Sequence, residues 1–227
     1  TSCSAYQTLT TYIPTQQDPI TPTACSTIHL NNNQFILNNL IIVVLCYIIG
    51  SFPTAYLLVK YKTNKDLTKE GSGNVGTLNS FTVSKSKFIG IAVLLIDILK
   101  GILPVYFMMF IMPHPYQSVM LGACALILGH NYPVWLKFKG GRGLATGAGI
   151  FMVINYYIFI GWCIVWLLVF LVKRKVLIAN TIATFLLPFY VLLINFFSFL
   201  VVNSNVQGFS LNYFTIYSII ITIIILS

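Results

Sequence analysis

The segment from His130 to Gly147 holds residue types that could bind a phosphate at a membrane surface. It reads HNYPVWLKFKGGRGLATG and lies between two long apolar runs. Glycine lets backbone N–H groups approach an anion closely, and lysine or arginine supplies the opposing charge. The candidate phosphate-binding residues are Lys137, Lys139, Gly140, Gly141, Arg142 and Gly143. The segment therefore predicts a ligand that carries phosphate and meets lipid.

A second glycine-rich turn, GSGNVG over residues 71–76, follows a lysine-rich stretch. The spacing matches the dinucleotide fingerprint, but that fingerprint needs a preceding strand in a βαβ unit, so we reject it here. The turn would present the Ser72 hydroxyl and the Asn74 amide at the head of a helix, where they suit an oxyanion or a hydroxyl. An ordinary turn with a helix cap is the alternative. We predict Ser72, Asn74 and Asn79 as catalytic residues, supported by Gly71, Gly73 and Gly76.

Ionisable residues within the apolar runs are further candidates, because they are costly at membrane depth unless they are paired or functional. Asp97 and Lys100 are three residues apart and share a helix face, so they would form an ion pair. That pair is either structural or part of the active site. His130 and Asn131 are also supporting candidates, although a histidine at a helix end more often satisfies backbone carbonyls.

The composition predicts the class of protein that must position these residues. Of the 227 residues, 57% are hydrophobic and 7% are charged, which is typical of a polytopic membrane protein. The formal charge of +9 lies in short loops beside apolar segments, as in proteins oriented in a membrane, so we do not expect nucleic acid as a partner. No metal site is predicted.

The order of apolar and basic segments predicts an all-α fold with about seven transmembrane helices. The apolar runs cover residues 40–59, 88–112, 118–136, 144–172, 176–202 and 213–227. Loop 60–87, loop 137–142 and the triplet 173–175 are basic, which predicts that all three are cytoplasmic. Segment 144–172 must then leave and return, through two short helices or a re-entrant hairpin that turns near residues 155–157. The N-terminus is predicted outside and the C-terminus inside, with the helices packed through Gly90, Gly122, Ala123 and Gly161.

The first 39 residues differ in composition from the rest. They are rich in Thr, Asn, Gln and Pro and hold no Lys or Arg, which excludes a secretory signal peptide. We predict a flexible extracytoplasmic tail over residues 1–39 and a membrane domain over residues 40–227. Cys3 and Cys25 could pair there, whereas Cys46, Cys124 and Cys163 lie in apolar runs and are predicted to be packing residues.

Taken in order, these motifs closely resemble a known family. GSFP at 50–53, GSGNVG at 71–76 with Asn79, DILKG at 97–101, and GHNYP at 129–133 leading into KFKGGRGLAT at 137–146 are similar to the bacterial acyl-phosphate:glycerol-3-phosphate acyltransferases. The resemblance spans about residues 40–200.

The resemblance implies a multi-pass enzyme of the bacterial inner membrane with its active site facing the cytoplasm. It implies transfer of a fatty acyl group from acyl phosphate to the 1-hydroxyl of glycerol 3-phosphate, giving lysophosphatidic acid for phospholipid synthesis, without metal or coenzyme A. Its partners would be these two substrates and the lipid bilayer, and the oligomeric state is left open. By the same resemblance, Ser72 corresponds to the family's essential serine and residues 140–143 to its phosphate loop, with Arg142 where lysine is usual.

The departures from the family pattern suggest an alternative. Leu78 and Thr82 replace a threonine and an essential arginine, and Leu177 lies where a serine is expected, leaving Asn180 as the nearby polar candidate. The family's basic tail is missing after Ser227, so either the chain is truncated or that motif is lost, and the end within an apolar run favours truncation. The alternative is a diverged paralogue with a changed acceptor, or a non-catalytic membrane protein that binds lipid phosphate. A small transporter is disfavoured because no inverted repeat is evident.

Overall fold

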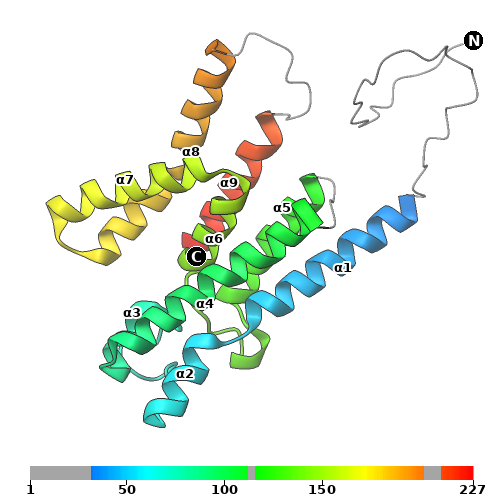
Figure 1. The fold of residues 1–227 in the computed structure, drawn as a ribbon. Helices are drawn as coiled ribbons and strands as arrows, with labels where there is room; N and C mark the ends of the chain where they lie inside the picture. Colours follow the sequence, from blue (N-terminus) through cyan, green and yellow to red (C-terminus); the bar gives the residue numbers. More distant parts are fainter. Residues whose placement is uncertain (1–31, 112–115, 202–210, 227) are drawn as a thin grey trace, which may run out of the picture.

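The computed structural model describes residues 32–111, 116–201 and 211–226, and the regular structure within these ranges is helical (Figure 1). The main helices are α1 Asn32–Ser51, α2 Thr54–Thr63, α3 Thr77–Ser84, α4 Lys87–Tyr106, α5 Tyr116–Asn131, α6 Leu144–Ile154, α7 Tyr156–Lys173, α8 Val176–Val201 and α9 Leu211–Leu226. A π-helical turn, Phe107–Ile111, continues α4, and a 3-10 turn, Val134–Leu136, follows α5. The prediction of an all-α fold is confirmed.

Five helical segments of the described chain are long and apolar enough to cross a membrane. They are Asn33–Thr63, Lys87–Phe110, Tyr116–Leu136, Tyr156–Lys173 and Val176–Leu193. Leu144–Ile154 and Ile216–Leu226 are apolar but shorter. These segments support the predicted multi-pass membrane protein, while the count of seven spans and the orientation of the termini stay predictions.

Helix α1 begins earlier than the predicted membrane domain. The predicted membrane domain begins at residue 40, whereas α1 starts at Asn32. Once the apolar run is helical, each further residue adds a backbone hydrogen bond at little cost, so the helix extends into the asparagine-rich stretch despite its weak propensity. The rest of the predicted tail, with Cys3 and Cys25, lies outside the described residues.

The long apolar segment 144–172 is broken where the sequence predicted a turn. Helix α6 ends at Ile154, and α7 begins at Tyr156. Asn155 between them has an extended backbone, and its side-chain oxygen accepts a hydrogen bond from the Tyr157 N–H at 3.1 Å. Asparagine at this position caps the new helix, which explains the break.

Glycines allow the closest helix crossings. A Cβ at Gly50 on α1 would collide with the Leu126 carbonyl on α5, and one at Gly129 on α5 would collide with the Tyr47 carbonyl on α1. Gly101 and Gly149 make the same reciprocal contact between α4 and α6. These crossings pair α1 with α5 and α4 with α6.

The predicted small residues also lie at helix contacts. Gly90 meets Phe81 on α3, Gly122 meets Cys46 on α1, and Gly161 meets Tyr190 on α8. Ala123 is fully buried. Small residues therefore pack the helices together as the sequence predicted.

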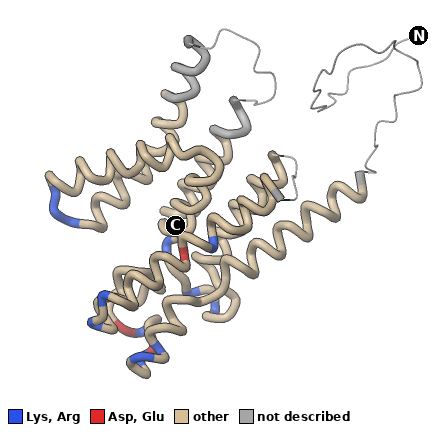
Figure 2. The backbone as a smooth tube through the Cα atoms, in the orientation of Figure 1, with Lys and Arg blue, Asp and Glu red and all other residues tan. Residues whose placement is uncertain are grey.

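The described charges gather toward one end of the molecule. Figure 2 shows Lys and Arg at the end that holds α2 and α3, in the loops below α5, and at the α7–α8 turn, while the described residues at the opposite ends of α1 and α5 have none. Large apolar side chains on α1, α4 and α7 are exposed, as expected of helices that face lipid. This asymmetry supports a common side for the three basic segments.

Candidate functional site

Ser72 lies on the loop between α2 and α3, and that loop is shaped by Asn79 on α3. The Asn79 Oδ1 accepts a hydrogen bond from the Ser72 N–H at 3.0 Å, and its amide nitrogen donates to the Leu67 carbonyl at 3.4 Å and the Glu70 carbonyl at 3.0 Å. The Asn79 side chain is buried. It is therefore placed to hold the loop, rather than to contact a substrate.

The start of the same loop is closed by Asp66. Its Oδ1 accepts hydrogen bonds from the Thr68 hydroxyl at 2.6 Å and the Thr68 N–H at 3.0 Å. The Thr68 hydroxyl bond, with a smaller contribution from Lys69, holds the pKa of Asp66 below its ordinary value. The carboxylate is thus ionised at neutral pH, and this tie is lost as the pH falls through the lowered pKa.

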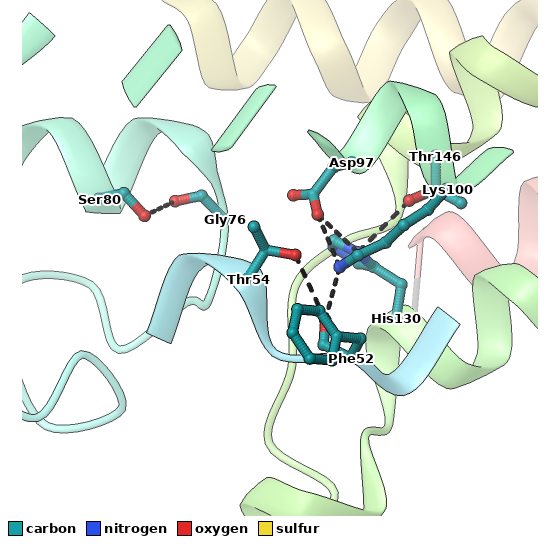
Figure 3. Close-up of polar contacts among 8 residues, drawn as sticks. All are labelled: Phe52, Thr54, Gly76, Ser80, Asp97, Lys100, His130 and Thr146. Atoms are coloured by element: carbon teal, nitrogen blue, oxygen red, sulfur yellow. Dashed lines mark hydrogen bonds and ion pairs between the residues drawn. The ribbon is translucent and has the colours of Figure 1, made fainter. Parts of the chain in front are cut away.

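Glycine conformations bring the loop back to α3. Gly71 and Gly73 have φ of 59° and 72°, in the left-handed region that favours glycine. Gly76 precedes α3, and the Ser80 hydroxyl donates to its carbonyl at 2.9 Å (Figure 3). The Asn74 N–H lies 3.5 Å from the Ser72 hydroxyl oxygen. The supporting glycines thus shape the turn that presents Ser72.

The second glycine segment folds back onto the end of α5. The Gly140 N–H donates to the Asn131 carbonyl at 3.0 Å, and the Gly141 N–H donates to the His130 carbonyl at 3.1 Å. A Cβ at Gly141 would collide with the His130 ring, so only glycine fits there. Gly143, with φ of 68°, is the N-cap residue that precedes α6.

One backbone hydrogen bond joins the two glycine-rich segments. The Val75 N–H donates to the Gly140 carbonyl at 3.1 Å. Residues that are 65 positions apart in sequence therefore lie together, and Ser72 is held near the glycine segment 140–143. Neither motif alone indicated this contact.

A cavity of about 500 Å³ opens between these two segments and helices α8 and α9. Its lining residues are Ser72, Gly73, Asn74, Asn131, Tyr132, Gly140, Gly141, Arg142, Leu144, Leu177, Asn180, Thr181, Thr184, Ile225 and Leu226. Ser72 and Asn74 line it together with Gly140, Gly141 and Arg142, while their catalytic and phosphate-binding roles stay predictions. Asn131 joins them, and its amide nitrogen donates to the Ile224 carbonyl of α9 at 2.6 Å.

Lys137 and Lys139 are not part of this lining. Both are exposed on the turn that follows the 3-10 segment, where Lys137 and Phe138 have φ of 52° and 62°. The turn separates them from Arg142, although all three cations lie within six residues. Of the three cations predicted to bind phosphate, Arg142 alone lines the cavity.

Asp97, Lys100 and His130 form a buried cluster beneath the site. The Lys100 ammonium lies 2.9 Å from the Asp97 Oδ1, with side chains 7% and 2% exposed, and the His130 Nδ1 lies 3.9 Å from the same oxygen. Lys100 also donates to the Phe52 carbonyl, and the Thr146 hydroxyl lies 3.4 Å from the His130 Nδ1 (Figure 3).

This cluster joins the chain break between α1 and α2 to α4, α5 and α6. Phe52 precedes Pro53, which has no N–H, so the backbone carbonyls at the end of α1 need other partners. Lys100 supplies one of them. None of the three ionisable residues lines the large cavity, which favours the structural alternative for the Asp97–Lys100 pair. Among the described residues, the partners of the His130 side chain are Thr146 and Asp97, and no backbone carbonyl is one of them.

Sequence reasoning missed the wall that α8 contributes. Thr181 and Thr184 line the cavity together with Asn180, the polar candidate noted on this segment. The signal was available, because residues 180 and 184 are one helical turn apart, as are Trp162 and Trp166 on α7. An apolar pocket adjoins the cavity and shares Leu144, Thr184 and Ile225 with it.

The chain is similar to known proteins in sequence and in fold. The family model described as glycerol-3-phosphate acyltransferase matches residues 40–227. The glycerol-3-phosphate acyltransferase of Pelagibacter ubique is 35% identical over 153 residues, covering 67% of this chain and 78% of the relative. Glycerol-3-phosphate acyltransferase 2 of Lactobacillus johnsonii is 47% identical over 129 residues, which cover 56% of this chain and 58% of the relative's length.

A solved structure shares the fold. The crystal structure of PlsY, an integral membrane glycerol 3-phosphate acyltransferase, in its glycerol 3-phosphate form matches with a TM-score of 0.67 and 30% identity. The match covers 83% of this chain and 86% of that one.

Proposed function

Since the chain belongs to the glycerol-3-phosphate acyltransferase family, we propose that its cavity carries a fatty acyl group from an acyl phosphate to the 1-hydroxyl of glycerol 3-phosphate. The protein is a multi-pass membrane acyltransferase of phospholipid synthesis. We place the reaction at the cytoplasmic face of a bacterial inner membrane, because the site lies beside the basic loops. The identity of the donor as an acyl phosphate is the most specific part of the proposal.

The observation that carries the proposal is the bond between the two loops. The hydrogen bond from Val75 to Gly140 holds Ser72 and Arg142 on one cavity, which adjoins an apolar pocket. Such a cavity has room for phosphate beside the glycine loop and for a hydroxyl beside Ser72, and the small apolar pocket next to it marks the direction in which a hydrocarbon chain would run. These are the three parts that the reaction brings together.

The chemistry asks little of the protein beyond binding and orientation. An acyl phosphate is an activated mixed anhydride, so attack by the acceptor hydroxyl on the acyl carbon forms the ester and breaks the bond to the phosphate oxygen. The hydroxyl proton passes to the departing phosphate, whose oxygens are basic. Donors aimed at the tetrahedral oxyanion supply the remaining stabilisation.

Ser72 is proposed to orient the acceptor, rather than to form an acyl enzyme. Within the described part of the chain, its hydrogen bonds are to Asn79 and Asn74, and no carboxylate or imidazole there is bonded to its hydroxyl. A serine nucleophile normally needs such a base. A hydroxyl positioned by the loop can instead bind the substrate.

The proposal is tested with the purified protein in detergent, by offering palmitoyl phosphate or palmitoyl coenzyme A with labelled glycerol 3-phosphate. We expect lysophosphatidic acid from palmitoyl phosphate alone, and loss of about a hundredfold or more in Ser72→Ala. Ser84→Ala, the same change at the end of α3, is the matched control and should keep activity.

Two outcomes would contradict this proposal. Lysophosphatidic acid formed from palmitoyl coenzyme A would exclude acyl phosphate as the specific donor. An inactive protein that gains activity with Thr82→Arg would identify a diverged paralogue, because Thr82 replaces an arginine of the family pattern. In the structure, Thr82 is exposed and donates to the Leu78 carbonyl at 2.9 Å, outside the cavity lining.

A further inference from the structure

Two tryptophans on α7 each donate a hydrogen bond to a polar residue of α8. The Trp166 indole N–H lies 2.6 Å from the Asn180 Oδ1, and the Trp162 indole N–H lies 3.2 Å from the Thr184 hydroxyl oxygen. The two tryptophans are four positions apart on α7, and Asn180 and Thr184 are four positions apart on α8. The two hydrogen bonds therefore lie one turn apart along the same helix contact. They fix Asn180 and Thr184 in defined orientations.

The chemistry of indole decides which groups stay available. An indole N–H is a donor only, so it must use the oxygen of Asn180 and a lone pair of Thr184. The Asn180 amide N–H groups and the Thr184 hydroxyl proton are left over, and among the described residues neither has a protein acceptor. Both side chains line the large cavity, where they add neutral donors to the charge of Arg142.

Position along α8 separates the roles of the two donors. Asn180 is one turn nearer than Thr184 to the basic triplet 173–175 that precedes α8. Thr184 is 1% exposed and borders both the polar cavity and the apolar pocket. An acyl phosphate has its phosphate, its acyl carbonyl and its hydrocarbon chain in the same order.

We propose that Asn180 and Thr184, oriented by Trp166 and Trp162, donate hydrogen bonds to the acyl phosphate. The Asn180 amide binds a phosphate oxygen, and the Thr184 hydroxyl binds the acyl carbonyl oxygen at the mouth of the apolar pocket. This inference rests on the proposed function, whose donor substrate it adopts. It adds two hydrogen-bond donors on α8 to those of the glycine loop and Arg142.

Asn180→Asp is the sharpest test, because a carboxylate still accepts the hydrogen bond from Trp166 but offers no donor and repels phosphate. We expect the KM for palmitoyl phosphate to rise about tenfold or more, while the KM for glycerol 3-phosphate stays within about twofold. A residue that served only to hold α7 against α8 would give an unchanged KM for both substrates, since the bond from Trp166 is retained.

The second donor and the orienting tryptophan are tested in parallel. Thr184→Val keeps the shape and loses the hydroxyl, so kcat with palmitoyl phosphate should fall about tenfold or more, whereas Thr184→Ser should keep it. Trp166→Phe should raise the KM for palmitoyl phosphate in the same sense as Asn180→Asp, but less. Trp135→Phe, at an exposed tryptophan outside the cavity lining, is the matched control.

Each outcome decides for or against the inference. Unchanged KM values in Asn180→Asp, or a rise confined to glycerol 3-phosphate, would overturn it, as would full activity in Thr184→Val. Thermal unfolding in detergent identifies any variant that fails to fold, and the paired Asp and Ser variants then carry the test. A wild-type protein inactive with palmitoyl phosphate would instead refute the proposed function, which makes the two failures distinguishable.

Discussion

At the scale of single residues, Asn79 determines the shape of the loop that presents Ser72. Its three hydrogen bonds reach the Ser72 N–H and the carbonyls of Leu67 and Glu70. The sequence grouped Asn79 with the catalytic residues because of its place in the motif. Its buried side chain, bonded to backbone throughout, indicates a positioning role instead.

We predict that Asn79→Ala lowers kcat at least about tenfold with Ser72 intact, because the loop loses three bonds at once. Unpaired backbone groups should also lower the free energy of unfolding by about 1–3 kcal/mol. Turnover and thermal unfolding in detergent measure the two effects. Thr82→Ala removes an exposed hydrogen bond on the same helix and should change neither. Wild-type turnover in Asn79→Ala would contradict the positioning role.

Arg142 gives a second prediction at this scale. Arg142 is among the residues that line the cavity, whereas Lys137 and Lys139 lie on an exposed turn outside that lining. Arg142→Gln should therefore raise the KM of the phosphate substrates about tenfold or more, since a charge-assisted contact contributes about 1.5–3 kcal/mol. Arg142→Lys keeps the charge without the planar fork and should fall between.

The matched variants Lys137→Gln and Lys139→Gln make the same chemical change outside the cavity. Each should raise KM less than Arg142→Gln does, when measured in the same detergent and at the same ionic strength. An equal or larger effect at either lysine would show that the turn folds over the site when substrate binds.

At the scale of the helices, the buried Asp97–Lys100 pair connects α4 to the end of α1 and to α5. It lies within α4, reaches the chain break at Phe52, and contacts His130 at the end of α5. Breaking a buried pair leaves one charge without a partner, which typically costs about 3–5 kcal/mol. Removing both charges avoids that cost.

Lys100→Met should therefore lower the temperature of thermal unfolding more than the double variant Asp97→Leu with Lys100→Met. We expect the wild type and the double variant to unfold at higher temperatures than the single variant, because only the single variant leaves a buried carboxylate uncompensated. Unfolding of detergent-solubilised protein, followed by circular dichroism, gives the comparison. A double variant that is no more stable than Lys100→Met would show that the pair's geometry, and not its charge balance, maintains this connection.

Helix positions could be predicted from the sequence where apolar runs and caps determine them. The starts of α4 and α8 and the break at Asn155 agree closely with the predicted runs, because lysines, Asn155 and hydrophobic length act locally. The Val75–Gly140 bond and the Trp166–Asn180 bond could not be predicted, since each joins segments whose approach depends on tertiary packing. The same reason explains why the cavity wall on α8 was missed.

At the scale of the whole molecule, we predict that the shortness of α6 determines how deep the site lies in the membrane. Helix α6 has 11 residues, and at 1.5 Å per residue it extends roughly 16 Å, against about 30 Å of hydrocarbon. Figure 1 shows that the turn between α6 and α7 falls short of the ends of α8 and α9. From the shortness of α6 we predict that segment 144–172 forms the recessed hairpin rather than two full crossings.

Cysteine labelling in intact cells tests this geometry and the orientation together. In a chain without its five native cysteines, a membrane-impermeant maleimide applied outside should label Gln117→Cys at the start of α5. It should reach Lys173→Cys only after the cells are opened. We expect Asn155→Cys to resist labelling from outside, because its position lies within the hydrocarbon rather than at the far surface. Labelling of Asn155→Cys as fast as Gln117→Cys would instead establish two crossing helices. The glycine loop would then lie closer to the cytoplasmic surface than we predict.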